Sequence, residues 1–138
     1  MYQLSIEQEF NTSAEQLFAA WVAPEYFQKW FAPGSMTVPE ASADLKVGGL
    51  YRIVMQNEDG EQFIVGGTYE EVVPNERLVF TWKWEDGENT TKVAVTFRDL
   101  DDHGSVLSLS HTEFVEQEHC DKHYEGWIGC LTNLQKAI

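Results

Sequence analysis

Positively charged residues are scarce in this chain. Nine lysines and arginines face 23 aspartates and glutamates, which gives a formal net charge of −14. A surface of this sign repels phosphate backbones and anionic lipids. The composition therefore argues against nucleic-acid and membrane partners, and we interpret the acidity as an aid to solubility.

Long apolar runs and cysteines are also scarce. No stretch of the sequence approaches the ~20 consecutive apolar residues that a membrane-spanning helix needs. The only cysteines, Cys120 and Cys130, are ten positions apart in one expected helix. At ~1.5 Å of rise per residue they would lie about 15 Å apart along the helix axis, too far for a disulfide. Two free thiols indicate a reducing compartment, so we expect a cytoplasmic protein.

What the sequence does contain is typical of one globular domain. Of its 138 residues, 43% are hydrophobic and 13% aromatic, which argues against disorder. No repeat, linker or low-complexity segment divides the chain. We therefore expect residues 1–138 to form a single domain.

The most informative stretch is residues 66–84, GGTYEEVVPNERLVFTWKW. Its pattern predicts a strand, a Pro-Asn turn and a second strand. Because strand side chains alternate between faces, the second strand carries Leu78, Phe80, Trp82 and Trp84 on one side. Three large rings in a row on one buried face favour a concave sheet around a helix or a cavity.

The rest of the chain predicts two short helices and further strands. Residues 2–10 alternate as a strand, and a helix should follow with Thr12 or Ser13 as its N-cap. Pro24 suits the first turn of a second helix. Residues 36–43 should form an edge strand, because Pro39 cannot donate to a ladder. Gly66-Gly67 suggests a bulge where the sheet bends.

A long helix is predicted from about residue 117 to residue 138. Its predicted buried stripe, with Cys120 and His123 on the same side, is Tyr124, Trp127, Ile128, Leu131, Leu134 and Ile138. An antiparallel sheet must bury one face, and this helix is the only large amphipathic element available to cover it. We therefore predict an α+β helix-grip fold, in which a curved antiparallel sheet of about seven strands wraps around the C-terminal helix. Helix and sheet rarely fill such a grip completely, and the remaining gap should form a pocket.

Five segments, in this order, cover nearly the whole chain: SAEQLFAAWVAPEYFQKWF, ADLKVGGLYRIVM, GGTYEEVVPNERLVFTWKW, VLSLSHTEF and EGWIGCLTNL. With them the chain resembles the START/Bet v 1-like (SRPBCC) superfamily. Within that superfamily, it is similar to the branch named for homology to the activator of Hsp90 ATPase. The resemblance implies an internal hydrophobic cavity but no particular ligand, because members range from lipid carriers to cyclases and co-chaperone domains.

The pocket walls should come from the inward-facing positions of the strands and the last helix. Such walls, mostly apolar with a few polar groups, are typical of a site for a small hydrophobic molecule. The alternative for each single residue is a place in a filled core. The expected lining residues are Tyr51, Ile53, Met55, Phe80, Trp82, Trp84, Phe97, Leu107, Leu109, His111, Trp127 and Leu131.

His111 is the candidate with the most chemistry, because it ends an inward-facing apolar strand. A neutral imidazole there could bind a ligand or transfer a proton near neutral pH. Alternatively, it is a structural histidine bonded to Tyr51 or to a backbone carbonyl. The HCDKH segment places His119, Cys120 and His123 close together, but it lacks the glutamate of the zincin pattern and the further ligands that zinc needs. We therefore expect no metal and no cofactor.

Three functions remain open from the sequence. The first is a small-molecule binding protein without catalysis, since no convergent catalytic set is apparent. The second is a cyclase- or hydrolase-like enzyme with His111 as acid or base, assisted by Tyr51 or by a residue of the last helix. The third follows from the resemblance alone: a co-chaperone-like protein that binds an Hsp90 homologue.

Overall fold

A computed structural model describes all 138 residues as a seven-stranded antiparallel sheet with three helices. This confirms the predicted α+β helix-grip fold. The elements, in chain order, are β1 (Tyr2–Phe10), α1 (Ala14–Val22), α2 (Pro24–Trp30), β2 (Thr37–Ala43), β3 (Leu50–Gln56), β4 (Gln62–Val73), β5 (Arg77–Trp84), β6 (Thr91–Asp99), β7 (Ser105–Phe114) and α3 (Gln117–Ala137).

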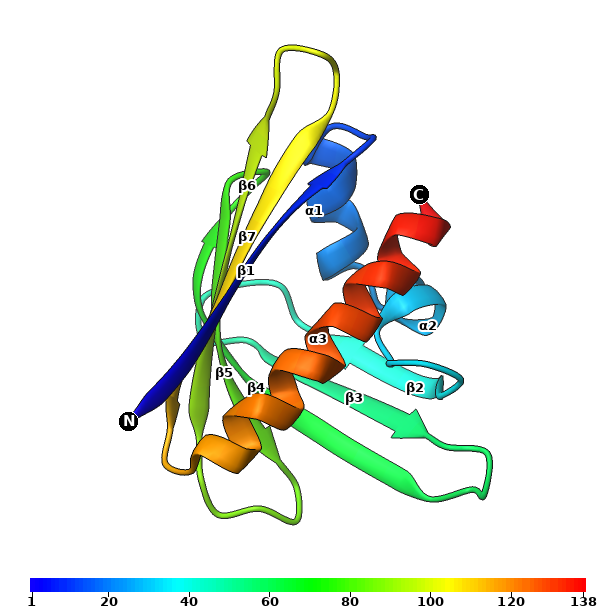
Figure 1. The fold of residues 1–138 in the computed structure, drawn as a ribbon, viewed down its shortest axis with the longest axis vertical. Helices are drawn as coiled ribbons and strands as arrows, with labels where there is room; N and C mark the ends of the chain where they lie inside the picture. The colour runs from blue at the N-terminus through cyan, green and yellow to red at the C-terminus, as the bar shows by residue number, and fades with distance from the viewer.

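The sheet is a meander closed at one side by the first strand. Its order is β1-β7-β6-β5-β4-β3-β2, so β2 is an edge strand, as Pro39 predicts. Figure 1 shows β2 and β3 running at a steep angle to β1 and β7, with α3 crossing the concave side of the curved sheet. The two short helices α1 and α2 lie on the same side as α3. Helices on one face of a bent sheet leave room beside α3 where the side chains do not meet.

The bend is not a bulge at Gly66-Gly67, and that prediction is wrong. Both glycines pair in regular register with β3, and the register shift between β4 and β5 lies between Tyr69 and Glu71. The glycines are required because backbone atoms of the neighbouring strands lie too close to leave room for a Cβ. A Cβ on Gly67 would lie 2.1 Å from the carbonyl oxygen of Thr81. Gly67 pairs with Tyr51, and the Tyr51 hydroxyl donates to that same Thr81 oxygen at 2.5 Å. The missing side chain therefore lets the Tyr51 ring cross β4 to reach β5.

The short helices begin where their sequences predict. Ser13 is the N-cap of α1, and its hydroxyl accepts a hydrogen bond from the Gln16 amide at 3.1 Å. The Ala14 amide donates to the Asp99 carboxylate at 2.8 Å, which ties this helix start to β6. Pro24 lies in the first turn of α2, where a missing amide hydrogen costs nothing.

The buried face of α3 is turned relative to the predicted stripe. Trp127, Leu131 and Leu134 are buried as expected, and so is Cys130. In contrast, Tyr124 is 45% exposed and Ile128 40% exposed, while Ile138 lies beyond the end of the helix. The buried face differs from the predicted stripe because the side of α3 that carries Cys130 packs against the segment after α2. There the Asn133 side chain donates to the Ala32 carbonyl at 2.7 Å, and a Cβ on Gly129 would lie 2.9 Å from the Pro33 Cβ.

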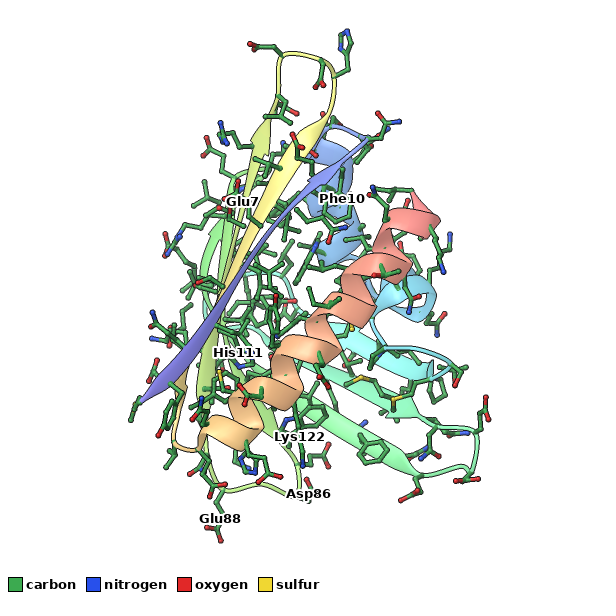
Figure 2. The ribbon with its side chains drawn as sticks, in the orientation of Figure 1. Glu7, Phe10, Asp86, Glu88, His111 and Lys122 are labelled. Carbon is green, nitrogen blue, oxygen red and sulfur yellow. The ribbon has the colours of Figure 1, made fainter.

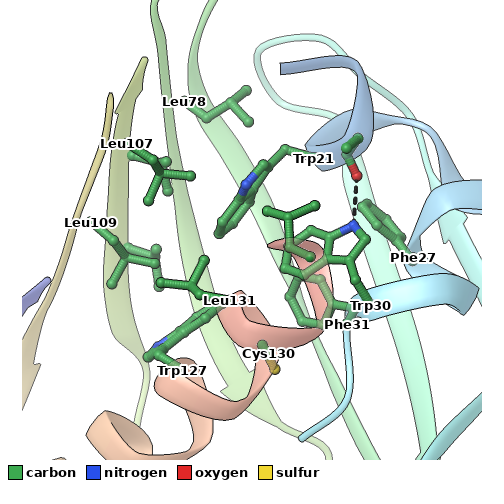
Figure 3. Packing of buried hydrophobic residues seen from close by; sticks show 14 of the residues in the cluster. Trp21, Phe27, Trp30, Phe31, Leu78, Leu107, Leu109, Trp127, Cys130 and Leu131 are labelled. Atoms are coloured by element: carbon green, nitrogen blue, oxygen red, sulfur yellow. Dashed lines mark hydrogen bonds between the residues drawn. The ribbon is translucent and has the colours of Figure 1, made fainter. Parts of the chain in front are cut away.

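Aromatic rings fill the core between α1, α2 and α3. The Trp21 ring stacks on Trp127 with centroids 5.8 Å apart and lies 4.8 Å from Trp30. Figure 3 shows these rings together with Phe31, and the Trp30 indole donating to the Ala20 carbonyl at 2.9 Å. Stacked and tilted aromatic rings therefore hold the three helices together. No helix of the protein is both long and apolar enough to cross a membrane.

Candidate functional site

A pocket of about 440 Å³ opens between α3 and the part of the sheet formed by β3, β4 and β5. Its size is within the usual range for small-molecule sites. Its walls come from every layer of the fold, namely the segment after α2, three strands and one face of α3. The lining residues are Phe31, Pro33, Met36, Met55, Phe63, Trp82, Trp84, Lys122, His123, Gly126, Trp127 and Cys130.

A glycine keeps the helix side of the pocket open. Gly126 lies between the lining residues His123 and Trp127, and a Cβ built on it would meet no heavy atom within 4 Å. A glycine inside a helix costs roughly 1 kcal/mol relative to alanine. At this position the glycine leaves space that a larger side chain would occupy.

The pocket walls are polarisable and mostly uncharged. Met36, Met55 and Cys130 contribute sulfur atoms among the aromatic rings, and thioethers pack well against ring edges. Burial raises the pKa of the Cys130 thiol to about 12, so this thiol stays protonated and is a poor nucleophile. The one charged lining residue, Lys122, has a 70% exposed side chain at the rim and pairs with Glu118 at 3.2 Å.

His123 is the polar centre of the pocket. Its Nδ1 lies 2.7 Å from the His119 carbonyl oxygen, which can only accept, so Nδ1 carries the ring hydrogen. Its Nε2 accepts from two indoles, Trp84 Nε1 at 3.0 Å and Trp82 Nε1 at 3.3 Å. Burial lowers the pKa of His123, while the bond to the His119 carbonyl opposes that shift. The imidazole is therefore neutral at physiological pH.

His111 lies next to this centre but is sealed in the core. Its side chain is 0% exposed and does not line the pocket. Trp127 Nε1 donates to His111 Nδ1 at 3.0 Å, and Nε2 lies 2.7 Å from the Thr91 hydroxyl. That hydroxyl donates onward to the Trp82 carbonyl at 3.2 Å, so it accepts from His111 Nε2. Burial, with a smaller contribution from His123, lowers the pKa of His111 to about 2. A histidine with both nitrogens bonded and this pKa is not available as an acid or base at neutral pH.

The structure distributes the predicted lining residues over three places. Met55, Trp82, Trp84 and Trp127 line the pocket. Tyr51, Ile53 and Phe80 line a separate void of about 10 Å³, room for at most one water. The remaining five are buried core residues that line neither the pocket nor the small void, namely Phe97, Leu107, Leu109, His111 and Leu131. Whether any of them contacts a ligand stays a prediction.

Sequence reasoning missed most of the helix side of the pocket. His123, Trp127 and Cys130 follow one another at intervals of four and three residues, so the helical period alone places them on one face. The predicted stripe included His123 and Trp127 but not Gly126 or Cys130, and it also included Tyr124 and Ile128, which are exposed. The Thr91 partner of His111 carried no signal, because it lies on another strand, twenty positions away.

Comparison with known proteins agrees with this architecture. A sequence model of the family described as activator of Hsp90 ATPase homolog 1-like protein matches residues 11–138. The chain belongs to this family. The resemblance read from the sequence segments is thereby confirmed, whereas no curated protein matches the chain.

Solved structures of other family-like proteins share the fold over nearly their whole length. A protein from Silicibacter pomeroyi described as AHSA1 is 29% identical with a TM-score of 0.85, covering 99% of this chain and 96% of that one. A protein from Chromobacterium violaceum is 23% identical with a TM-score of 0.91 and the same coverage. A Staphylococcus aureus protein of unknown function is 23% identical with a TM-score of 0.73, covering 96% and 91%. The last two are similar in fold only, and none of these names gives a ligand.

Proposed function

We propose that this protein binds a small, largely hydrophobic molecule in the pocket between α3 and strands β3 to β5. The observation that carries the proposal is a space of about 440 Å³ walled mostly by aromatic and sulfur-containing side chains. In an empty open pocket of this size, these apolar side chains face water and lack packing partners on one side. A ligand that fills it recovers those contacts and buries apolar surface.

The test is a thermal-shift screen against lipids, sterols and aromatic metabolites. A ligand at ~100 times its Kd stabilises the folded state by ~2.7 kcal/mol, which raises Tm by several degrees in a domain of this size. The matched variants are Gly126→Ala and Gly126→Leu, because a side chain at this position enters open pocket space. We expect both variants to fold, and the leucine to abolish the ligand-dependent shift while the alanine only weakens it. A ligand shift that survives Gly126→Leu unchanged would place binding elsewhere.

The arrangement favours binding over catalysis. The His111 acid/base hypothesis needs polar groups that converge on one point of the cavity. His111 is instead separated from the pocket and fully hydrogen-bonded. A measured turnover that is lost in His111→Gln but not in a destabilised control such as Val95→Ala, a core substitution outside the His111 hydrogen bonds, would reverse this conclusion.

The family name also motivates the co-chaperone hypothesis, in which the chain binds an Hsp90 homologue through its surface. Its support is the family match over residues 11–138 alone. The direct measurement is the ATPase rate of the host's Hsp90 at saturating concentrations of this protein. An unchanged rate would exclude the activator role.

A cytoplasmic location remains part of the proposal. Both cysteines are free and buried, in keeping with a reducing environment. Fractionation of the host cell, with a known cytoplasmic enzyme as reference, would test it.

A further inference from the structure

The polar end of the pocket has more hydrogen-bond donors than acceptors. The indole groups of Trp82 and Trp84 both point their N–H at one atom, His123 Nε2, at 3.3 Å and 3.0 Å. An indole nitrogen only donates, and a neutral imidazole nitrogen offers a single lone pair. Two donors therefore share one acceptor, and at least one of them is poorly satisfied. All three side chains line the pocket, so a ligand can reach them.

The tautomer of His123 also leaves a proton acceptor, Nε2, at this end of the pocket. Because Nδ1 donates to the His119 carbonyl oxygen at 2.7 Å, the unprotonated nitrogen is the one that faces the two indoles. A group that brings its own acidic hydrogen can donate it to Nε2. A second oxygen of the same group can then accept from the indole that loses its partner. The protonated carboxyl group has both functions on adjacent atoms.

We propose that the ligand of this pocket is an apolar molecule with one carboxyl group, and that the carboxyl group binds His123 together with one proton. This deepens the proposed function and rests on it. In the complex the proton lies between one carboxyl oxygen and His123 Nε2. If it moves to the ring, the O–H bond breaks and the N–H bond forms, and the electron pair stays on the carboxylate. The other oxygen accepts from the Trp82 or Trp84 indole, and the apolar body fills the space beside Gly126 and Trp127.

The charges around His123 favour uptake of the proton with the ligand. The titratable side chains near the ring are His111 from β7, and His119 and Lys122 from its own helix, where Lys122 is paired with Glu118. The indoles of β5 are uncharged. Figure 2 shows Asp86 and Glu88 on the loop after β5, near the same end of α3 as Lys122. A bare carboxylate would enter a protein of formal charge −14, past these acidic residues. A carboxyl group that arrives with its proton adds no net charge and so avoids this repulsion.

A primary amide also carries a donor and an acceptor on neighbouring atoms. Its hydrogen is not acidic, however, so its bond to Nε2 is a neutral one and no proton is taken up. Once the proton has moved to the ring, the hydrogen bond joins a carboxylate to an imidazolium, and such charge-assisted bonds are about twice as strong as neutral ones. The amide and the ester of the same acid are therefore the matched probes that isolate the carboxyl group.

The experiment compares 2-naphthoate with its methyl ester and its primary amide by titration calorimetry between pH 6 and pH 8. We expect the acid to bind with uptake of one proton, read from the dependence of the heat on buffer ionisation. Since the complex holds one proton more than its free components, the affinity for the acid should fall about tenfold per pH unit, or about 100-fold over this range. The affinities for the ester and the amide should not change with pH.

Two substitutions assign the effect to the proposed atoms. His123→Phe keeps a flat ring in the pocket but removes the acceptor, so proton uptake and the preference for the acid should disappear while the ester still binds. Trp84→Phe removes one of the two competing donors and should weaken the acid without abolishing proton uptake. Gly126→Leu should block all three probes.

The outcomes separate this inference from the proposed function. If the ester or amide binds and the acid binds no better and without a proton, the carboxyl proposal is overturned and the apolar pocket stands. If proton uptake persists in His123→Phe, the proposal is also overturned. If none of the three naphthalene probes binds although the thermal-shift screen yields an uncharged ligand that Gly126→Leu blocks, the carboxyl proposal fails and the proposed function stands. If the screen is also flat, both fail.

Discussion

Trp127 Nε1 on α3 donates a 3.0 Å hydrogen bond to Nδ1 of His111 on β7. This bond joins the long helix to the sheet at a point where neither partner reaches water, since the exposed fractions are 3% and 0%. It continues through Thr91 to the Trp82 carbonyl, so one chain of bonds connects α3, β7, β6 and β5. Trp82 and Trp127, which line the pocket, are therefore held in place through Thr91 and His111, which do not line it.

The burial of neutral His111 should make stability fall in mild acid. Its pKa is about 2 in the folded protein and near 6.5 when unfolded. The unfolded chain binds the proton first, so the contribution is fully present above pH ~6.5 and is lost progressively as pH falls toward 2. From pH 6.5 to pH 5, His111 should remove about 2 kcal/mol of unfolding free energy. His123, whose pKa is also lowered, adds to this loss.

Urea unfolding of the protein and of His111→Gln at pH 7 and pH 5 measures this loss. The variant should be less stable at pH 7 and should lose less between the two values. His103→Asn, at an exposed turn position with φ of 71° that asparagine tolerates, is the control and should keep the full pH dependence. Parallel pH profiles for the protein and His111→Gln would contradict the assignment.

Thr91→Val should destabilise the protein by about 1–3 kcal/mol, because it leaves His111 Nε2 buried without an acceptor. The substitution keeps the side-chain shape, so lost packing contributes little. Thr91→Ser retains the hydroxyl and should recover most of the difference. Denaturant midpoints of the three proteins give the comparison, and equal stability of the valine and serine variants would rule out the hydrogen bond as the cause.

Gly126 and Gly129 should respond in opposite ways to alanine. A Cβ at Gly126 meets open space, so Gly126→Ala should raise stability by roughly 0.5–1 kcal/mol through helix propensity. A Cβ at Gly129 lies 2.9 Å from the Pro33 Cβ, so Gly129→Ala should lose that gain or become destabilising. Thermal unfolding of the two variants compares their stabilities. A Gly129→Ala variant as stable as Gly126→Ala would show that Pro33 moves away from the added methyl group at no cost.

Gly67→Ala should be among the most damaging single substitutions in the sheet. Its Cβ would lie 2.1 Å from the backbone oxygen of Thr81, which also accepts from the Tyr51 hydroxyl. Relief requires β4 and β5 to separate, and we expect a loss above about 3 kcal/mol or no folded protein. Gly87→Ala, whose Cβ would keep an ordinary 3.5 Å from its neighbours, is the control and should fold normally. Circular dichroism and urea unfolding distinguish the two.

The sequence by itself determined the element order, the edge position of β2 and the aromatic face of β5. These follow from local physics, namely the alternation of strand side chains, the missing amide hydrogen of Pro39, the Ser13 cap of α1 and the Pro24 start of α2. The helical stripe on α3 was only half right, because hydrophobicity marks Tyr124 and Ile128 as buried although packing against the α2 segment turns them outward.

The tertiary structure alone decided what the two histidines do. From the sequence, His111 is the residue expected to meet a ligand, whereas His123 is placed only on the buried side of the last helix. Contacts between distant segments reverse these roles, since Thr91 and Trp127 satisfy both nitrogens of His111, while Trp82 and Trp84 bring their N–H groups to His123 at the pocket wall. Burial and hydrogen-bond pairing depend on how strands and helices pack in three dimensions, and no local pattern of residues encodes that packing.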